Sequence, residues 1–279
     1  ARLANHLEAL GLRPGDTIAM VSRNDLHMFE VYWAALRSGL YVTAVNHHLT
    51  ADETDYILTD SAAKVLFADA AVAEAVSTSG DIAALAEAGH RIAWGGVIDG
   101  FEPYDDVLAA APDTLRTDEP RGTDMLYSSG TTGRPKGAML THGNMFWNNM
   151  NALLSLDTMS TDISLVAAPM FHIGGLNVTT LITLQKGGQL VILPAFDPTA
   201  ALQLIEQAQD LCLYGDVERR NGLIEHHKIG FNDHGTGDSH ALALAAGELT
   251  GTAGSMEESK ATKQETFVLS RGHRVSRPR

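Results

Sequence analysis

Hydrophobic side chains in the first 70 residues follow two patterns that alternate along the chain. Short apolar runs bounded by turn residues predict buried strands, whereas apolar residues repeated every three or four positions predict amphipathic helices. We expect strands at residues 17–21, 41–45 and 64–68, and helices at residues 2–10 and 25–36. Thr50 followed by Glu53 predicts a capping box that opens a further helix. This order of elements predicts βαβ units, a layered parallel sheet and therefore the α/β class.

The pattern weakens between residues 69 and 120, which are rich in alanine and acidic side chains. Only helical stretches near residues 70–77 and 81–88 stand out there. Clearer periodicity returns afterwards. We expect strands at residues 124–127, 138–142, 163–168 and 189–193, and helices at residues 143–154, 178–184 and from Pro198 onward, with Asp197 as N-cap.

Residues 127–137 hold four Ser or Thr, three Gly and one Lys between two expected strands. Glycine lets a backbone approach a ligand closely, and successive N–H groups can form a nest for an anion. The run differs from the common P-loop, where Gly-Lys precedes Ser or Thr, because Lys136 lies between Pro135 and Gly137. The alternative is a flexible Gly/Ser/Thr linker, which the ordered Pro-Lys-Gly disfavours. We therefore interpret the run as a loop that binds a polyphosphate.

This run resembles the phosphate-binding signature of the adenylate-forming enzymes: acyl-CoA synthetases, luciferases and nonribosomal-peptide adenylation domains. In that family a carboxylate attacks the α-phosphate of ATP, the loop holds the β- and γ-phosphates, and the thiol of CoA then displaces AMP. The resemblance implies ATP and CoA as substrates and Mg²⁺ as cofactor. It assigns these residues to the phosphates: Ser128, Ser129, Gly130, Thr131, Thr132, Gly133 and Lys136. Thr131 is also the candidate metal ligand.

A second stretch, residues 169–176, resembles a family motif in which an aromatic-His pair lies near the acyl pocket. The resemblance implies that His172 lies on the acyl side of the site, and no other residue receives a catalytic role. Taken alone, a His beside glycines at a strand end is more often structural. The apolar neighbours of His172 favour a fatty acid or another apolar acid over an amino acid. His142, which also matches the family pattern, either positions the loop or begins the following helix.

Composition narrows the class of protein further. The formal net charge is −14, and residues 1–210 account for all of it with 11 Lys/Arg and 25 Asp/Glu. An acidic body disfavours non-specific binding to nucleic acid. The single cysteine, Cys212, excludes an internal disulfide. No apolar run approaches the ~20 residues of a membrane helix, and the start shows no signal-peptide pattern. We expect a cytoplasmic protein that begins inside a longer chain, and its oligomeric state stays open.

Several groups of polar residues are disfavoured as metal sites. Adjacent histidines diverge in helices and strands, and an acidic loop is usually solvated. The histidines near the C-terminus have no metal-site spacing. The residues concerned are His47 and His48; Glu102, Asp105 and Asp106; and His226, His227, His234 and His240 with Asp233 and Asp238.

The family resemblance covers residues 1–209 and then stops. We expect a partial adenylate-forming domain at residues 1–209 and an unassigned, irregular, poorly ordered tail at residues 210–279. Residues 214–218 and 236–238 resemble the adenine and ribose motifs of the family only superficially, because they follow His172 too soon. A frameshifted or fused reading frame would produce such a tail.

Three functions are compatible with these features. The first is an acyl-CoA synthetase represented by an incomplete part of its large domain, without the C-terminal lid that completes such sites. The second is a non-enzymatic remnant that binds nucleotide weakly or not at all and acts through a partner. The third, a kinase-like phosphotransferase, shares a phosphate loop but lacks an Asp/Asn catalytic loop. The sequence favours the first, and we expect the isolated chain to form no acyl-CoA.

Overall fold

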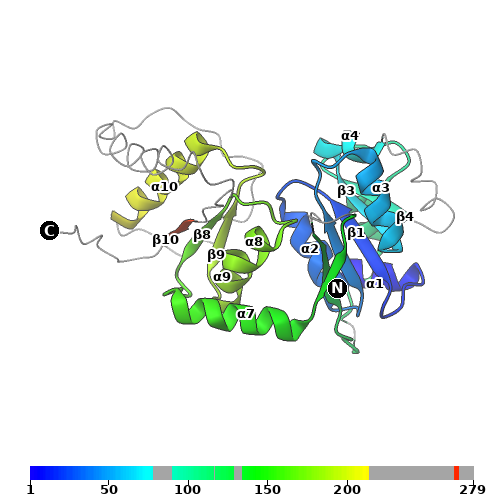
Figure 1. The fold of residues 1–279 in the computed structure, drawn as a ribbon, viewed down its shortest axis with the longest axis horizontal. Coiled ribbons are helices and arrows are strands. Elements are labelled where there is room, and N and C mark those ends of the chain that lie inside the picture. The colour runs from blue at the N-terminus through cyan, green and yellow to red at the C-terminus, as the bar shows by residue number, and fades with distance from the viewer. Residues whose placement is uncertain (78–89, 116, 129–133, 214–266, 270–279) are drawn as a thin grey trace. The chain divides into compact units, whose positions relative to one another are not determined.

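The computed structural model describes residues 1–77, 90–115, 117–128, 134–213 and 267–269 (Figure 1). The chain divides into two compact units, Ala1–Glu206 with Glu265–Arg279, and Gln207–Gln264. Of the second unit, the described part comprises only residues 207–213, the end of a helix.

A seven-stranded sheet forms the centre of the first unit. Its strand order is β5-β4-β3-β1-β2-β6-β7, and all neighbouring strands are parallel except β6 and β7. The strands are β1 (Thr17–Val21), β2 (Tyr41–Val45), β3 (Ala63–Asp69), β4 (His90–Trp94), β5 (Glu102–Pro103), β6 (Thr123–Tyr127) and β7 (Gly137–Leu140). The predicted α/β class with a mainly parallel sheet is confirmed.

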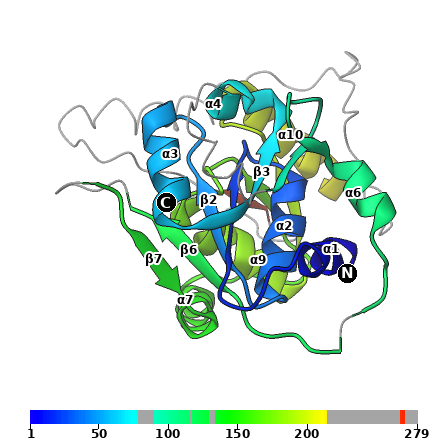
Figure 2. The ribbon, with the colours of Figure 1, turned by 90° about the vertical axis from the view of Figure 1, so that its right-hand side faces the viewer.

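Helices cover both faces of this sheet, and α2 (Leu26–Leu36) and α3 (Ala51–Asp60) lie on opposite sides of it (Figure 2). Alternate residues of β1 point to opposite faces of the sheet. Ile18 and Met20 pack in the core beneath α1, α2 and α6, whereas Ala19 and Val21 pack in the core beneath α3. Burial on both faces explains why the central strands β1, β2 and β3 consist mainly of apolar residues. The helices are α1 (Arg2–Ala9), α2 (Leu26–Leu36), α3 (Ala51–Asp60), the 3₁₀ turn η1 (Ala70–Val72), α4 (Glu74–Ser77) and α6 (Tyr104–Ala110).

A second, three-stranded sheet follows, with the order β10-β8-β9. Strand β8 (Ile163–Val166) is parallel to β9 (Gln189–Ile192) and antiparallel to β10 (Phe267–Leu269). Asn24, which follows β1, joins this region to the large sheet. Its Nδ2 donates to the carbonyl of Ala168 (2.9 Å), and its Oδ1 accepts from the amide of Met170 (2.8 Å). The remaining helices are α7 (His142–Ser155), α8 (Ile173–Gly175), the π-helical η2 (Leu176–Thr180), α9 (Leu181–Lys186) and α10 (Pro198–Leu213).

Several expectations need correction. Strand β4, strand β5 and helix α6 were not predicted. The strand expected at residues 138–142 ends at Leu140, because Thr141 caps α7. The helix expected at residues 178–184 is split between η2 and α9, and the one at residues 70–77 is split between η1 and α4. Strand β10 lies inside the segment expected to be irregular. The helix expected at residues 81–88 falls outside the described residues.

Candidate functional site

The predicted phosphate loop begins and ends on a β-hairpin. Strands β6 and β7 pair in antiparallel register, with Tyr127 opposite Gly137. The amide of Ser128 donates to the carbonyl of Lys136 (3.0 Å), so these two residues face each other at the base of the hairpin. Both are exposed. The structure therefore brings together the first and last predicted phosphate-binding residues, at the carboxyl end of a sheet strand.

The other predicted phosphate ligands lie outside the described residues. They are Ser129, Gly130, Thr131, Thr132 and Gly133, so the candidate metal ligand Thr131 is among them. Their assignment to ATP stays a prediction. The described part of the chain contains no group of three His, Cys, Asp or Glu side chains that could hold a metal ion. It also contains no helix long and apolar enough to cross a membrane.

Close packing fixes the start of β7. A Cβ atom at Gly137 would lie 3.0 Å from Cγ of Met125 and 3.2 Å from Cε2 of Tyr127. The side chains of β6 therefore occupy the space that a larger residue would need. Glycine at this position lets the strand after Lys136 lie directly against the strand before Ser128.

Helix α3 contacts both ends of the loop. The hydroxyl of Tyr127 donates to Oδ2 of Asp60 (2.7 Å), and the hydroxyl of Tyr56 donates to the carbonyl of Pro135 (3.1 Å). The guanidinium of Arg134 lies 5.2 Å from the ring centroid of Tyr56. Burial, and then the carboxylate of Asp60, raise the pKa of Tyr127, so this phenol stays protonated and donates. No sequence motif marks Tyr56 or Asp60, although their i,i+4 spacing places them on one face of the helix.

Helix α7 leaves the hairpin directly after β7. The Oγ1 of Thr141 accepts from the amide of Asn144 (3.2 Å), and Oδ1 of Asn144 accepts from the amide of Thr141 (3.0 Å). This reciprocal pair is a capping box that fixes the start of the helix. His142 is the first residue of α7, so the structure supports a helix-start position for it.

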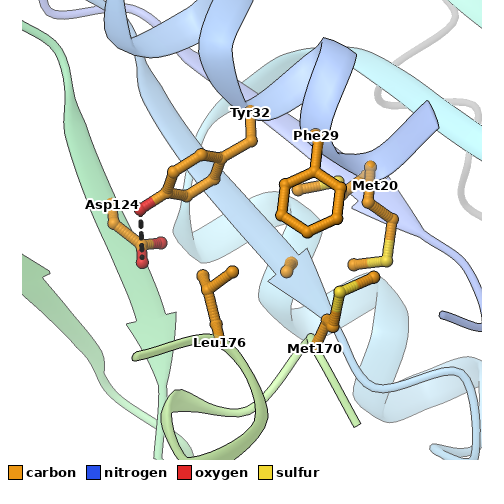
Figure 3. A pocket seen from close by; sticks show the side chains of 8 residues that line it. Met20, Phe29, Tyr32, Asp124, Met170 and Leu176 are labelled. Atoms are coloured by element: carbon orange, nitrogen blue, oxygen red, sulfur yellow. Dashed lines mark hydrogen bonds between the residues drawn. The ribbon is translucent and has the colours of Figure 1, made fainter. Parts of the chain in front are cut away.

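A buried carboxylate lies on β6, on the side opposite α3. Asp124 is 1% exposed, and its Oδ2 accepts from the hydroxyl of Tyr32 (3.4 Å). It lines a cavity of about 10 Å³, whose other lining residues are mostly apolar (Figure 3). Burial raises its pKa to about 7, although the bond from Tyr32 acts in the opposite direction. The sequence pattern predicts a strand at Asp124 but gives no sign that its carboxylate is buried.

The structure shows His172 in a local structural role. It caps α8, and its Nδ1 accepts from the amide of Gly174 (3.1 Å). A Cβ atom at Gly175 would lie 2.1 Å from the carbonyl oxygen of Pro169, so this turn requires glycine. Within the described residues, no hydrogen bond or ion pair joins His172 to β6, β7 or Lys136. Its position on the acyl side of the site stays a prediction.

Comparison with known proteins places these features in context. The family model for "AMP-binding enzyme" matches residues 1–216. A feruloyl-CoA synthase of Amycolatopsis sp is 40% identical over 219 residues, covering 77% of this chain and 41% of that protein. An indoleacetate–CoA ligase of Aromatoleum aromaticum is 32% identical, covering 74% and 41%. The crystal structure of ATP-bound MatB from Rhodopseudomonas palustris matches with a TM-score of 0.62 and 31% identity, covering 74% and 40%. The chain thus spans less than half the length of these relatives.

Proposed function

The chain belongs to the family of AMP-binding enzymes, and we propose that it forms the phosphate-binding part of an ATP-dependent acyl-CoA synthetase. The observation that carries this proposal is the hairpin that sets Ser128 against Lys136 at the two ends of a Gly/Ser/Thr-rich run. In the proposed reaction a carboxylate attacks the α-phosphate of ATP, pyrophosphate leaves, and the thiol of CoA then takes the acyl group from AMP.

The residues of the hairpin suit the departure of pyrophosphate. Negative charge develops on the leaving group, and preorganised N–H donors with a cation stabilise such charge. Lys136 is exposed, and within the described residues it forms no ion pair, so its ammonium is available to a phosphate. We assign Ser128 and Lys136 to the β- and γ-phosphates, together with Ser129, Gly130, Thr131, Thr132 and Gly133.

We propose that Mg²⁺ binds together with the phosphates of ATP. Bound Mg²⁺ neutralises phosphate charge, and it is usually held by few protein ligands together with the substrate. Thr131 is its candidate ligand.

We propose an apolar carboxylic acid as the substrate. The apolar residues around His172 support a fatty acid, whereas relatives named for feruloyl-CoA and indoleacetate support an aromatic acid. Thermal-shift measurements with palmitate, ferulate and indoleacetate distinguish these classes. The acid that binds should raise the unfolding midpoint of the chain, and His172→Ala should abolish the increase. An increase that survives this substitution would separate the acid site from His172.

Calorimetric titration of MgATP into the chain tests the nucleotide site. We expect binding that weakens about tenfold or more in Lys136→Ala, since a charge-assisted contact to phosphate is lost. Lys186→Ala, which removes the same charge from the exposed end of α9, is the matched control and should bind like the wild type. Absence of binding at millimolar MgATP would leave the non-catalytic remnant as the better account of the chain.

Acyl-CoA formation is a separate test. The chain covers about two fifths of the length of its CoA-ligase relatives, so we expect it to bind nucleotide without forming a thioester from ATP, CoA and either class of acid. Thioester formation that is lost in Lys136→Ala would overturn this expectation and show a complete enzyme.

Because a single cysteine excludes an internal disulfide, we propose the cytoplasm as the location of the protein.

A further inference from the structure

Helix α3 is a rigid element beside the phosphate hairpin. Its N-terminus is fixed by the capping box of Thr50 and Glu53. Its inner face is held by Ile57 and Leu58, which are 2% and 4% exposed. Side chains on rigid, well-packed elements hold a functional site more accurately than side chains on loops do. A contact from α3 to the hairpin therefore fixes the hairpin relative to the packed core.

Two side chains in the last turns of α3 make such contacts. Asp60 accepts from Tyr127, the residue directly before Ser128, at 2.7 Å. Tyr56 donates to the carbonyl of Pro135, the residue directly before Lys136, at 3.1 Å. The same helix face thus contacts the chain where it enters the loop and where it leaves the loop.

The chemistry of these contacts makes them a connected group. The hydroxyl of Tyr56 also lies 3.4 Å from Oδ1 of Asp60, and its single proton favours the shorter contact to Pro135. The carboxylate of Asp60 accepts the phenol of Tyr127, and hydrogen bonds to charged groups are stronger than neutral ones. The guanidinium of Arg134 lies 5.2 Å from the ring centroid of Tyr56, a favourable cation–π distance.

The structure assigns to Tyr56 and Asp60 the role of positioning residues that hold Ser128 and Lys136 in the geometry that binds the phosphates of ATP. We call these two residues the α3 brace. This inference rests on the proposed nucleotide site, because the brace acts on ATP only through Ser128 and Lys136. A carboxylate beside a polyanion site repels the ligand, so the role of Asp60 must lie in its hydrogen bond and not in its charge.

That distinction gives a sharp test at one residue. Asp60→Ala removes the acceptor for Tyr127, and we expect about a tenfold rise in the Kd for MgATP, the size of effect that loss of one charge-assisted hydrogen bond produces. Asp60→Asn keeps a neutral acceptor oxygen for Tyr127 and removes the repulsive charge, so its Kd should lie closer to that of the wild type than to that of Asp60→Ala. Tighter binding by Asp60→Ala would mean that the carboxylate acts only through charge, and this would overturn the proposal.

Matched tyrosine variants test the other half of the brace. Tyr127→Phe and Tyr56→Phe each delete one hydroxyl, and each should raise the Kd for MgATP about threefold to tenfold. Tyr41→Phe deletes a hydroxyl at the amino end of β2, outside the hairpin, and should leave the Kd unchanged. The thermal midpoint is measured for every variant. Equal Kd values in Tyr127→Phe, Tyr56→Phe and the wild type would exclude the positioning role.

A second measurement separates failure of the brace from failure of the nucleotide site. The amide of Ser128 bonds to the carbonyl of Lys136, so its hydrogen exchange reports the geometry of the hairpin without any ligand. We expect faster exchange at Ser128 in Asp60→Ala and wild-type exchange in Asp60→Asn. If the wild type binds no MgATP, the proposed function fails, and hydrogen exchange at Ser128 alone tests whether the α3 brace holds the hairpin. Unchanged exchange in Asp60→Ala would then overturn the brace as well.

Discussion

The buried carboxylate of Asp124 makes the stability of this protein depend on pH in an unusual direction. The side chain is 1% exposed and accepts one hydrogen bond, at 3.4 Å from Tyr32. Tyr32 also contacts Sδ of Met145 at 3.1 Å, so the phenol is shared between β6 and α7. Among the described residues, no Lys, Arg or His forms an ion pair with Asp124. Burial therefore dominates and raises the pKa to about 7.

The sign and size of the effect follow from linkage. Well below pH 4 the carboxyl is protonated in both the folded and the unfolded chain, and its titration does not change stability. Between pH 4 and pH 7 the unfolded chain ionises while the folded chain keeps its proton, so the free energy of unfolding falls as pH rises. A rise from 3.8 to about 7 corresponds to about 4 kcal/mol, since one pKa unit equals about 1.4 kcal/mol. Above pH 7 the loss is complete.

Asp124→Asn removes this titration while it keeps the shape of the side chain and an acceptor for Tyr32. We expect the free energy of unfolding of the variant, relative to that of the wild type, to rise by about 4 kcal/mol from pH 4 to pH 8. The assay is urea unfolding followed by circular dichroism at several pH values, with the difference between variant and wild type plotted against pH. This difference cancels the titration of the other carboxylates.

Asp16→Asn is the control of opposite sign. Burial acts to raise the pKa of Asp16, but the hydrogen bond from Lys64 at 2.7 Å and further contacts outweigh it, and the pKa is lowered. A carboxylate with a lowered pKa stabilises the folded state above its unfolded pKa. The free energy of unfolding of Asp16→Asn, relative to that of the wild type, should therefore fall as pH rises from acid to neutral. A difference between Asp124→Asn and the wild type that stays constant from pH 4 to pH 8 would refute the argument.

Two further predictions concern local geometry. Thr141→Ala removes the capping box of α7 and should lower the free energy of unfolding by about 1 kcal/mol, whereas Thr141→Ser should restore it; equal stability of all three proteins in urea would contradict the role of the cap. Gly175→Ala places a Cβ atom 2.1 Å from the carbonyl oxygen of Pro169 and should cost about 3 kcal/mol or more, because backbone must move. Gly143→Ala, where the nearest atom is 3.6 Å away, is its control and should unfold like the wild type.

The sequence predicts the parts of the fold whose signals are local. Strands β1 to β3 are mainly apolar runs, and the capping box of Thr50 and Glu53 needs only four neighbouring residues. Strand β4 was missed because it begins with His90 and Arg91, which interrupt the apolar run, and because it follows a long Ala-rich stretch. In β10 only three residues pair, which is too few to show a periodicity.

The candidate site divides in the same way. Its loop was visible as a motif, since glycines, hydroxyls and a lysine follow one another in sequence. Its supports were not, because they depend on residues far apart in the chain: Asp60 and Tyr127 are separated by 67 positions, and Tyr32 and Asp124 by 92. A carboxylate in a strand usually indicates a solvent-exposed position, and only the packing of α2 against β6 shows that Asp124 is buried.

Strand β6 connects these two supports. Its side chains alternate between the two faces of the sheet, and the burial of its five residues alternates with the same period of two. Asp124 points toward α2, where Tyr32 holds it, as Figure 3 shows. Tyr127, an odd number of positions later, packs with the core on the side of α3 and reaches Asp60. The strand that leads into the predicted phosphate loop is therefore held from both faces by polar contacts at opposite ends. These directional side-chain bonds add to the backbone pairing of β6 with β2 and β7, and together they fix the position of Ser128.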